Sequence, residues 1–239
     1  MPVYRLDRRL VFPPPDHAED GLLAVGGDLR PARLLLAYRS GIFPWYDDDS
    51  PILWHSPDPR CVFVLDKVHA SRSLRKTVAR GVYEVRYDQA FARVIRACKE
   101  ARRRGDGGTW ITDEMEEAYV ALHEMGYAHS VESYKDGELA GGLYGVSIGH
   151  MFFGESMFTT QPDASKVALV TLAARLRAKG WSFMDSQVAN PVTLALGAEE
   201  WSRSQYLERL AGEVSLEGEV GKWRAEASLT AAVDATGGR

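Results

Sequence analysis

The dipeptide Asp136-Gly137 separates two predicted strands, and it constrains the fold more than any other feature of this chain. The strands are predicted at residues 129–135 and 138–146. An Asp-Gly pair between two such runs strongly indicates a two-residue β-hairpin, because both central positions of that turn need a positive φ. Residues 151–158 are predicted to add a third antiparallel strand. The centre of the chain is therefore predicted to be an antiparallel β-sheet.

Helices are predicted on both sides of this central region in the sequence. Their limits follow capping residues, with Asp28, Asp88 and Asp113 as expected N-terminal caps, and glycines that end each helix. The predicted helices cover residues 31–40, 71–79, 88–104, 113–126, 163–179 and 202–210, and further strands are predicted at 82–86 and 181–188. Helices and strands that alternate in this way place the chain in the α/β (α+β) class.

The domain division is predicted from proline. Aromatic loops rich in proline at residues 43–46 and 51–60 suggest a small N-terminal domain covering 1–62. Residues 63–239 then form the main domain, and the tail after about residue 211, rich in Gly, Glu and Ala, is expected to be loosely ordered.

Composition excludes several classes of protein. At 239 residues and 45% hydrophobic, the chain can bury a full core, and it contains no apolar run long enough to span a membrane. Its first residues lack the apolar stretch of a signal peptide. Two cysteines, Cys61 and Cys98, provide neither a disulfide framework nor metal-ligand spacing. We expect a cytoplasmic protein without a metal or other cofactor.

Three polar residues interrupt apolar segments and form the strongest candidate site. Glu155 lies in the run 151–158, and Asp185 and Gln187 lie in the strand predicted at 181–188. Burying a carboxylate without a partner costs several kcal/mol, so such groups are paired or functional. In a regular strand Asp185 and Gln187 share one face, as Glu155 does with Phe153 and Met157. Such a cluster suits a substrate with one charged and one apolar part; the alternative is a polar network that fixes strand register.

Charge and aromatic residues leave a second possibility open. The net charge is −4, but basic residues gather in two predicted helices as Arg72, Arg75, Lys76, Arg80, Arg93 and Arg96. An acidic chain with such local runs can hold a phosphate backbone on one face, although a solvated helix face explains them equally well. Trp45 and Trp110 lie in loops bounded by proline or glycine. Each is either a lid on the core or a platform on which a base stacks.

Ten short motifs, in order, resemble the bacterial leucyl/phenylalanyl-tRNA–protein transferase family from about Gly21 to Leu210. They are GLLAVGGDL (21–29), GIFPWY (41–46), PILWHSPDPR (51–60), GTWIT (108–112), AHSVE (128–132), GGLYGV (141–146), FFGESMF (152–158), ASK (164–166), DSQ (185–187) and LGA (196–198). The resemblance implies a small N-terminal α/β domain followed by a GNAT-like acyltransferase domain with a mixed, mostly antiparallel sheet.

The resemblance also implies a reaction and its partners. Leu or Phe, and less readily Met, would pass from aminoacyl-tRNA to a protein whose N-terminal residue is Arg or Lys. The product would be recognised by the bacterial N-degron pathway. We expect a monomer that needs no cofactor, because the aminoacyl ester is already activated.

The resemblance assigns roles to individual residues. It implies that Asp185, Gln187 and Glu155 serve peptide-bond formation, with Glu155 and Asn190 on the acceptor side. Trp45 and Trp110 match tryptophans that hold the 3′-terminal adenosine, and the six basic residues named above would hold the tRNA backbone. The implied amino-acid pocket consists of Leu143, Phe152, Phe153, Met157, Leu172 and Met184.

The chain departs from the family pattern in a few places. Relatives often carry Met where it has Leu143 and Phe where it has Leu172, and both replacements keep the wall apolar. Val192 and Ala195 replace residues of an Asn-x-His…Ser-Leu-Gly pattern, which affects the acceptor side. Two other classes stay open: an acyl-CoA-dependent N-acyltransferase of the same fold, and a tRNA-binding module without catalytic activity.

Overall fold

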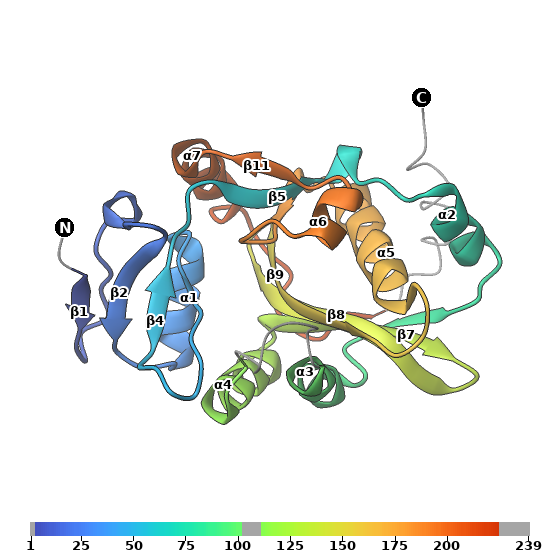
Figure 1. The fold of residues 1–239 in the computed structure, drawn as a ribbon, viewed down its shortest axis with the longest axis horizontal. Helices are drawn as coiled ribbons and strands as arrows, with labels where there is room; N and C mark the ends of the chain where they lie inside the picture. Colours follow the sequence, from blue (N-terminus) through green and yellow to red (C-terminus); the bar gives the residue numbers. More distant parts are fainter. Residues whose placement is uncertain (1–2, 102–110, 225–239) are drawn as a thin grey trace.

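The computed structural model describes residues 3–101 and 111–224 and has a mixed α/β architecture built on two sheets. The smaller sheet has the order β1-β2-β4-β3, and its strands are Tyr4–Leu6, Leu22–Gly26, Leu53–His55 and Phe43–Pro44 in that order. Helix α1, Pro31–Arg39, packs beside it (Figure 1). Pro31 begins α1 with a suitable φ, but Asp28 does not cap it, because the N-terminal cap is Arg30.

The larger sheet has seven strands in the order β11-β5-β10-β9-β8-β7-β6. Its strands are β5 Arg60–Val64, β6 Glu84–Tyr87, β7 Ala128–Lys135, β8 Glu138–Ile148, β9 Met151–Thr159, β10 Phe183–Asp185 and β11 Glu199–Trp201. Asp136 and Gly137 form the hairpin turn with φ values of 52° and 82°, as predicted. All neighbouring strands are antiparallel except β9 and β10. The predicted mixed, mostly antiparallel sheet is confirmed.

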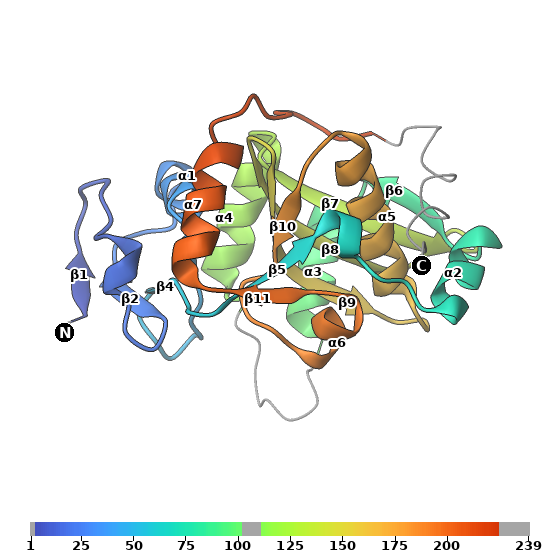
Figure 2. The ribbon, with the colours of Figure 1, turned by 90° about the horizontal axis from the view of Figure 1, so that it is seen from above.

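Helices cover both faces of the larger sheet (Figures 1 and 2). Helices α3 and α4 lie on one face and α5 on the other. The remaining helices lie at the edges and ends of the molecule. Their bounds are α2 Arg72–Ala79, α3 Phe91–Glu100, α4 Asp113–Glu124, α5 Ala164–Ala178, α6 Pro191–Ala195 and α7 Arg203–Glu213, with short 3₁₀ turns at Pro15–His17 and Leu65–Lys67.

Two predicted caps are wrong. Asp88 does not cap α3: the backbone N–H groups of Gln89 and Ala90 donate to Glu132, at 3.2 Å each. Helix α4 is capped by Thr112 rather than Asp113, since the Thr112 hydroxyl accepts from the backbone of Met115 at 3.2 Å. In each case the helix begins after a residue other than the expected aspartate: the N-terminal cap position of α3 is Ala90, without a side-chain hydrogen bond, and that of α4 is Thr112.

The two sheets share a hydrophobic core. One cluster of buried residues includes Trp54 of the smaller sheet, Tyr38 of α1 and Phe153 of the larger sheet. The division proposed at residue 62 falls inside β5, and the whole of β5 pairs within the larger sheet. Helix α7 runs to Glu213, and Trp223, in the segment that follows it, is buried. No helix in the described ranges is both long enough and apolar enough to cross a bilayer.

Candidate active site

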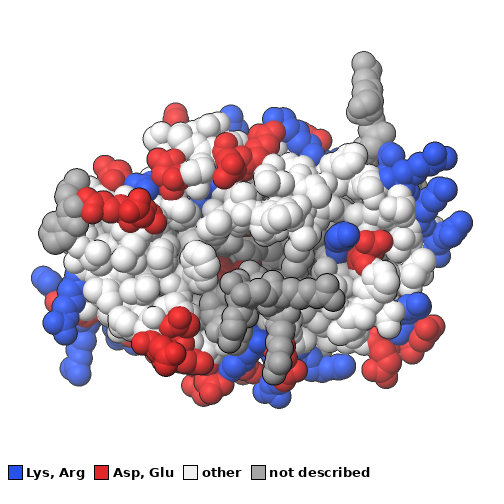
Figure 3. All heavy atoms as spheres, viewed as in Figure 1, with Lys and Arg blue, Asp and Glu red and all other residues white. Residues whose placement is uncertain are grey.

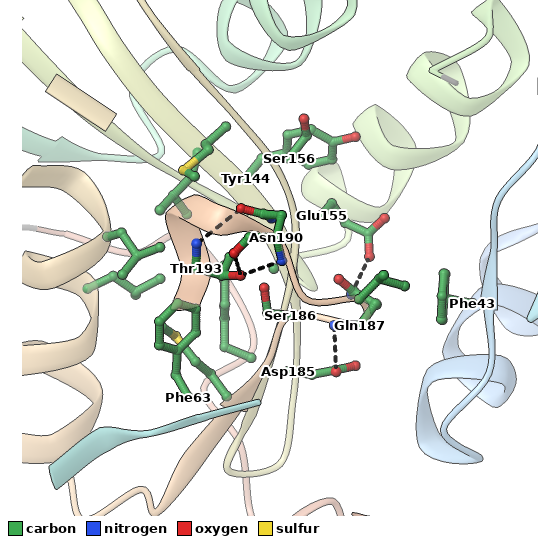
Figure 4. A pocket seen from close by; sticks show the side chains of 18 of the residues that line it. Phe43, Phe63, Tyr144, Glu155, Ser156, Asp185, Ser186, Gln187, Asn190 and Thr193 are labelled. Carbon is green, nitrogen blue, oxygen red and sulfur yellow. Dashed lines mark hydrogen bonds between the residues drawn. The ribbon is translucent and has the colours of Figure 1, made fainter. Parts of the chain in front are cut away.

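A cavity of about 160 Å³ lies between β8, β9, β10, α5 and α6. One part of its wall is apolar and consists of Phe63, Leu143, Phe152, Met157, Leu169, Leu172 and Met184. The other part is polar and includes Glu155, Asp185, Gln187 and Asn190. In Figure 4, Glu155 and Gln187 point toward each other, with Phe43 on one side and Asn190 on the other.

The cavity exists because the parallel strands β9 and β10 pair at a single position. Asp185 lies opposite Phe153, and no further register pair joins the two strands. Beyond this position Gly154–Met157 of β9 and Ser186–Val188, which follow β10, do not pair with each other, and both segments border the cavity. Both sets run in the same direction from the shared point, so the strand ends present their polar groups to one space.

A β-bulge places Glu155. Tyr144 of β8 lies opposite Ser156, and Gly145 lies opposite Gly154, so Glu155 is the extra residue without a partner. Such a bulge breaks the alternation of side chains and turns one of them in a new direction. Phe153 therefore points away from the cavity into the other core, where its ring lies 5.1 Å from that of Tyr38. Met157, beyond the bulge, lines the cavity.

Two tyrosines hold the Glu155 carboxylate. Tyr38 donates to Oε1 at 2.7 Å and Tyr119 donates to Oε2 at 3.0 Å, and the two hydroxyl oxygens also lie close to each other. Burial raises the pKa of Glu155 to about 7, although both tyrosine hydrogen bonds lower it. A carboxyl group with such a pKa is present in both charge states near neutral pH and can respond to a cationic substrate.

Asp185 is paired with Arg60 in a buried, bidentate ion pair. Arg60 Nε and Nη2 donate to the two carboxylate oxygens at 2.8 and 2.6 Å. Tyr206 donates to Oδ2 at 3.1 Å. Asp185 is 1% exposed and Arg60 is fully buried. The pKa of Arg60 is raised, since the charge of Asp185 outweighs the cost of burial.

Gln187 is oriented by two different carboxylates. Its backbone N–H donates to Asp185 Oδ1 at 3.0 Å, and its φ is 52°. Its side-chain amide donates to Glu155 Oε1 at 3.4 Å. Strand β10 ends at Asp185, so the expectation that Asp185 and Gln187 share a strand face is wrong. Asp185 fixes the backbone of Gln187, and Glu155 contacts its side chain.

Most of the expected pocket is found together in the wall of the cavity. Leu143, Phe152, Met157, Leu172 and Met184 line it, and Phe153 does not. Sequence reasoning did not find Phe63 and Leu169, because an apolar residue of a buried strand or helix carries no local mark of a cavity.

Asn190 borders the cavity and also caps a helix. Its side-chain oxygen accepts from the backbone N–H groups of Val192 and Thr193, at 2.9 and 3.0 Å. It thereby begins α6, which carries both Val192 and Ala195, the positions that depart from the family pattern. The side-chain oxygen of Asn190 is therefore already engaged by the helix.

Of the two tryptophans expected at the nucleotide site, one lies within the described residues. Trp45 lines the cavity and is 43% exposed, and its ring lies 5.7 Å from that of His55. Trp110 lies outside the described residues. The exposed indole of Trp45 at the edge of a cavity offers a flat apolar surface.

Basic side chains gather at the end of the molecule that carries α2 (Figure 3). Arg72, Lys76 and Arg80 are exposed, and Arg75 is half-buried. On α3, Arg93 is exposed, but Arg96 is paired with Glu116 at 3.2 Å. The basic residues of the two helices are thus not equivalent as ligands for phosphate.

Four functional candidates were missed by sequence reasoning. Arg60, Tyr38, Tyr119 and Tyr206 hold the acidic groups of the site, and each lies at least 21 residues from the carboxylate that it contacts. A charged Arg60 at the start of the apolar run 61–65 was a usable signal, because a buried arginine needs an acidic partner. The tyrosines gave no such signal.

The site can hold a molecule that has an apolar side chain and a group able to meet an acid. Among the described residues no group of three or more His, Cys, Asp or Glu could hold a metal ion. The described residues of the site can contribute positioning, hydrogen bonding and the Glu155 carboxylate. These are the means of an enzyme that transfers an already activated group.

Comparison with known proteins agrees with an enzyme that transfers an activated group. The family described as leucyl/phenylalanyl-tRNA protein transferase matches residues 62–211, and the N-terminal domain of the same family matches residues 27–58. The enzyme of that name from Myxococcus xanthus is 58% identical, covering 93% of this chain and 97% of the relative. That from Syntrophotalea carbinolica is 56% identical, covering 88% and 92%.

A solved structure, L-PGS from Bacillus licheniformis, aligns with a TM-score of 0.39 and 11% identity, covering 88% of this chain and 70% of that one. A likeness at that level carries no argument. The matches in sequence, in contrast, show that the protein is an aminoacyltransferase. The chain belongs to the leucyl/phenylalanyl-tRNA protein transferase family, whose members transfer an aminoacyl group from tRNA to protein.

Proposed function

We propose that the protein transfers Leu or Phe, and less readily Met, to the α-amine of proteins that begin with Arg or Lys, marking them for N-degron degradation. The observation that carries this proposal is the meeting of an apolar cavity with Glu155. The apolar wall suits the donor side chain, and the carboxylate suits a cationic acceptor. We further propose a cytoplasmic monomer, since charged tRNA is a cytoplasmic substrate.

The donor side chain would lie against the apolar wall. Leu143 of β8, Phe152 of β9 and Leu172 of α5 belong to the apolar part of the cavity wall. An unbranched or γ-branched chain can enter the cavity beside this wall. Each misplaced methylene changes binding by only about 1–3 kcal/mol, so modest promiscuity among Leu, Phe and Met is expected.

The reaction needs little chemical assistance. The α-amine attacks the ester carbonyl, a C–N bond forms, and the C–O bond to the ribose breaks, so that the proton lost by nitrogen ends on the ribose oxygen. An α-amine has a pKa of roughly 7.7–8, so a sizeable fraction is neutral near pH 7.4. Positioning of the two substrates therefore accounts for most of the acceleration.

Gln187 is proposed to orient the attacking amine. With its amide N–H₂ group directed to Glu155, the carbonyl oxygen of the same amide is available to accept a hydrogen bond from the amine. Asp185 holds the backbone of Gln187 and is a positioning residue. A glutamine is a poor base, so the ribose 2′-hydroxyl or water would complete the proton transfer.

Glu155 is the better candidate of the two acids for contact with the acceptor's Arg or Lys side chain. The charge of Asp185 is already balanced by Arg60 at 2.6 Å. Among the described residues, the hydrogen-bond partners of Glu155 are neutral: two tyrosine hydroxyls and one amide. A cation beside Glu155 would lower its raised pKa and gain the attraction of the ionised form.

The tRNA would be held at two places. Trp45 would stack on the 3′-terminal adenosine, which is worth about 1–3 kcal/mol per base. Trp110 is proposed to share this role. The basic residues of α2 would hold the phosphate backbone, and such contacts carry little sequence information. Trp45→Ala should raise the KM for charged tRNA; an unchanged KM would exclude this stacking.

The experiment mixes the purified protein with radiolabelled Leu-tRNA or Phe-tRNA and a model protein that begins with Arg. Label should enter the protein, and it should disappear when the first residue is Ala. Acyl-CoA in place of charged tRNA should give no transfer. Label that enters the Ala protein equally would contradict the acceptor rule, and transfer from acyl-CoA would favour an N-acyltransferase.

A further inference from the structure

The last described segment of the chain is tied to the larger sheet on the face that α5 covers. Residues 214–224, here the C-terminal strap, follow α7 and end beside β7 and α5. The backbone N–H of Trp223 donates to Asp88 Oδ2 at 2.6 Å, and that of Gly221 donates to the Gly126 carbonyl at 3.0 Å. Arg175 donates to the Arg224 carbonyl at 2.7 Å. The strap is therefore fixed at several points.

The Trp223 indole is held on more than one side. It is 3% exposed and stacks on His129 with ring centroids 3.9 Å apart and planes 6° from parallel. His129 is itself fixed, since its Nδ1 lies 2.9 Å from Asp88 Oδ2. The guanidinium of Arg175 lies 5.2 Å from the centre of the indole. The position of the indole is thus set by the sheet and by α5 together.

Trp223 touches a residue of the amino-acid pocket. Its ring lies 5.9 Å from that of Phe152, which lines the cavity. On another side of Phe152 lies Gly145, where an added Cβ would be 2.6 Å from the end of the phenyl ring. The ring of Phe152 is bounded by the backbone of β8 and by the indole of the strap.

We propose that Trp223 is a positioning residue that sets the depth of the amino-acid pocket, and hence the choice of donor, by fixing the ring of Phe152. This inference rests on the proposed function. Without the indole, the phenyl ring can withdraw from the cavity into the vacated space. A deeper cavity contacts Leu poorly and accommodates the larger Phe side chain better.

The test measures kcat/KM for Leu-tRNA and for Phe-tRNA with the full-length protein and its variants. In Trp223→Leu the ratio of Phe to Leu transfer should rise about fivefold or more, which is within the range expected for one or two methylenes. Trp223→Phe keeps an aromatic ring of smaller size and should shift the ratio in the same direction by a smaller factor. The ratio does not depend on the fraction of folded protein.

Trp181 provides a matched control. It is 5% exposed, belongs to the same core cluster and stacks on His150, but it does not line the cavity or contact Phe152. Trp181→Leu should lower stability without changing the donor ratio. A second control is Trp223→Leu in a Phe152→Leu background, where the shift should vanish because the indole acts through that ring.

An unchanged ratio in both Trp223 variants would overturn the inference while leaving the proposed function intact. An equal shift in Trp181→Leu, or a full shift in the Phe152→Leu background, would also overturn it. No transfer of either amino acid by the unchanged protein would remove the proposed function and this inference with it.

Discussion

Two groups of enclosed carboxylates lie on the same seven-stranded sheet, and one of them borders the cavity described above. The open acid cluster consists of Glu155, Asp185 and their partners. The closed acid cluster consists of Asp88, Glu132 and His129. In each cluster burial raises the pKa of a glutamate to about 7, that of Glu155 in the first and of Glu132 in the second.

The surroundings of these two glutamates differ. Glu132 is fully buried and accepts from two backbone N–H groups before α3 and from Ser130 at 2.6 Å. It holds the backbone of the loop that leads into α3, and α3 itself has no side-chain cap. Glu155 accepts from two tyrosines and an amide and borders the cavity. A raised pKa therefore does not identify a site unless a ligand can reach the group.

The largest expected effect is that of Asp185→Asn in the open cluster. It leaves the buried Arg60 without a counter-charge, which should reduce the free energy of unfolding by about 3–5 kcal/mol. Urea unfolding measures the loss. Replacing both partners, Arg60→Met with Asp185→Leu, should restore stability but not transfer. Recovery of transfer in the double variant would show that the pair has no part in positioning Gln187.

The closed cluster should contribute to the change of stability with pH, as should Glu155, whose pKa is raised to the same value. The ordinary pKa of a glutamate is 4.5, and that of Glu132 is about 7 in the folded protein. At pH values between these two, the folded state therefore holds more protons than the unfolded state. Stability should fall as pH rises through this window, by on the order of 3 kcal/mol at most. Glu132→Gln should remove much of this fall; an equally steep profile in that variant would assign it to other groups.

The same substitution at the two glutamates should separate them by activity. Glu155→Gln removes a charge that would face the acceptor. It should lower kcat/KM for an Arg-starting acceptor roughly 30- to 150-fold, which corresponds to about 2–3 kcal/mol of activation free energy. Glu132→Gln should stay within about twofold of the unchanged protein, because its group touches no substrate. Full activity in Glu155→Gln would reject the acceptor role.

The smallest expected effect concerns two arginines, of which one is paired with an acidic residue and the other is not. Arg75 of α2 has no ion-pair partner among the described residues, and Arg96 of α3 pairs with Glu116. Arg75→Ala should weaken tRNA binding by less than about tenfold and reduce the slope of log Kd against log salt by about one. Arg96→Ala should change the slope less. Equal slopes in both variants would exclude α2 as the phosphate-binding face.

Much of the larger sheet could be predicted from sequence, and the strands that were missed are short. The hairpin at Asp136-Gly137 was found because a turn of that type is decided by the residues in it. Strands β5 and β11 were not predicted, since five or three residues give little pattern. The expected end of α3 at residue 104 lies outside the described residues, and the described helix ends at Glu100.

The candidate site divides in the same way. The residue types of Glu155, Asp185 and Gln187 inside apolar runs marked them as unusual. Their directions did not follow, because one bulged residue reverses which side chains face the cavity, as Phe153 shows. A glycine within a strand, here Gly154, indicates a bulge and was the available signal.

The sequence by itself determined the central hairpin, most of the helices, the polar residues of the site and the family resemblance, because each depends on residues close together along the chain. Only the tertiary structure decided that Arg60 neutralises Asp185, that Tyr38 and Tyr119 hold Glu155, and that Trp223 lies behind Phe152. These pairs are separated by tens of residues or more. Local pattern cannot specify them, since they form only when the folding of the whole chain brings distant elements together.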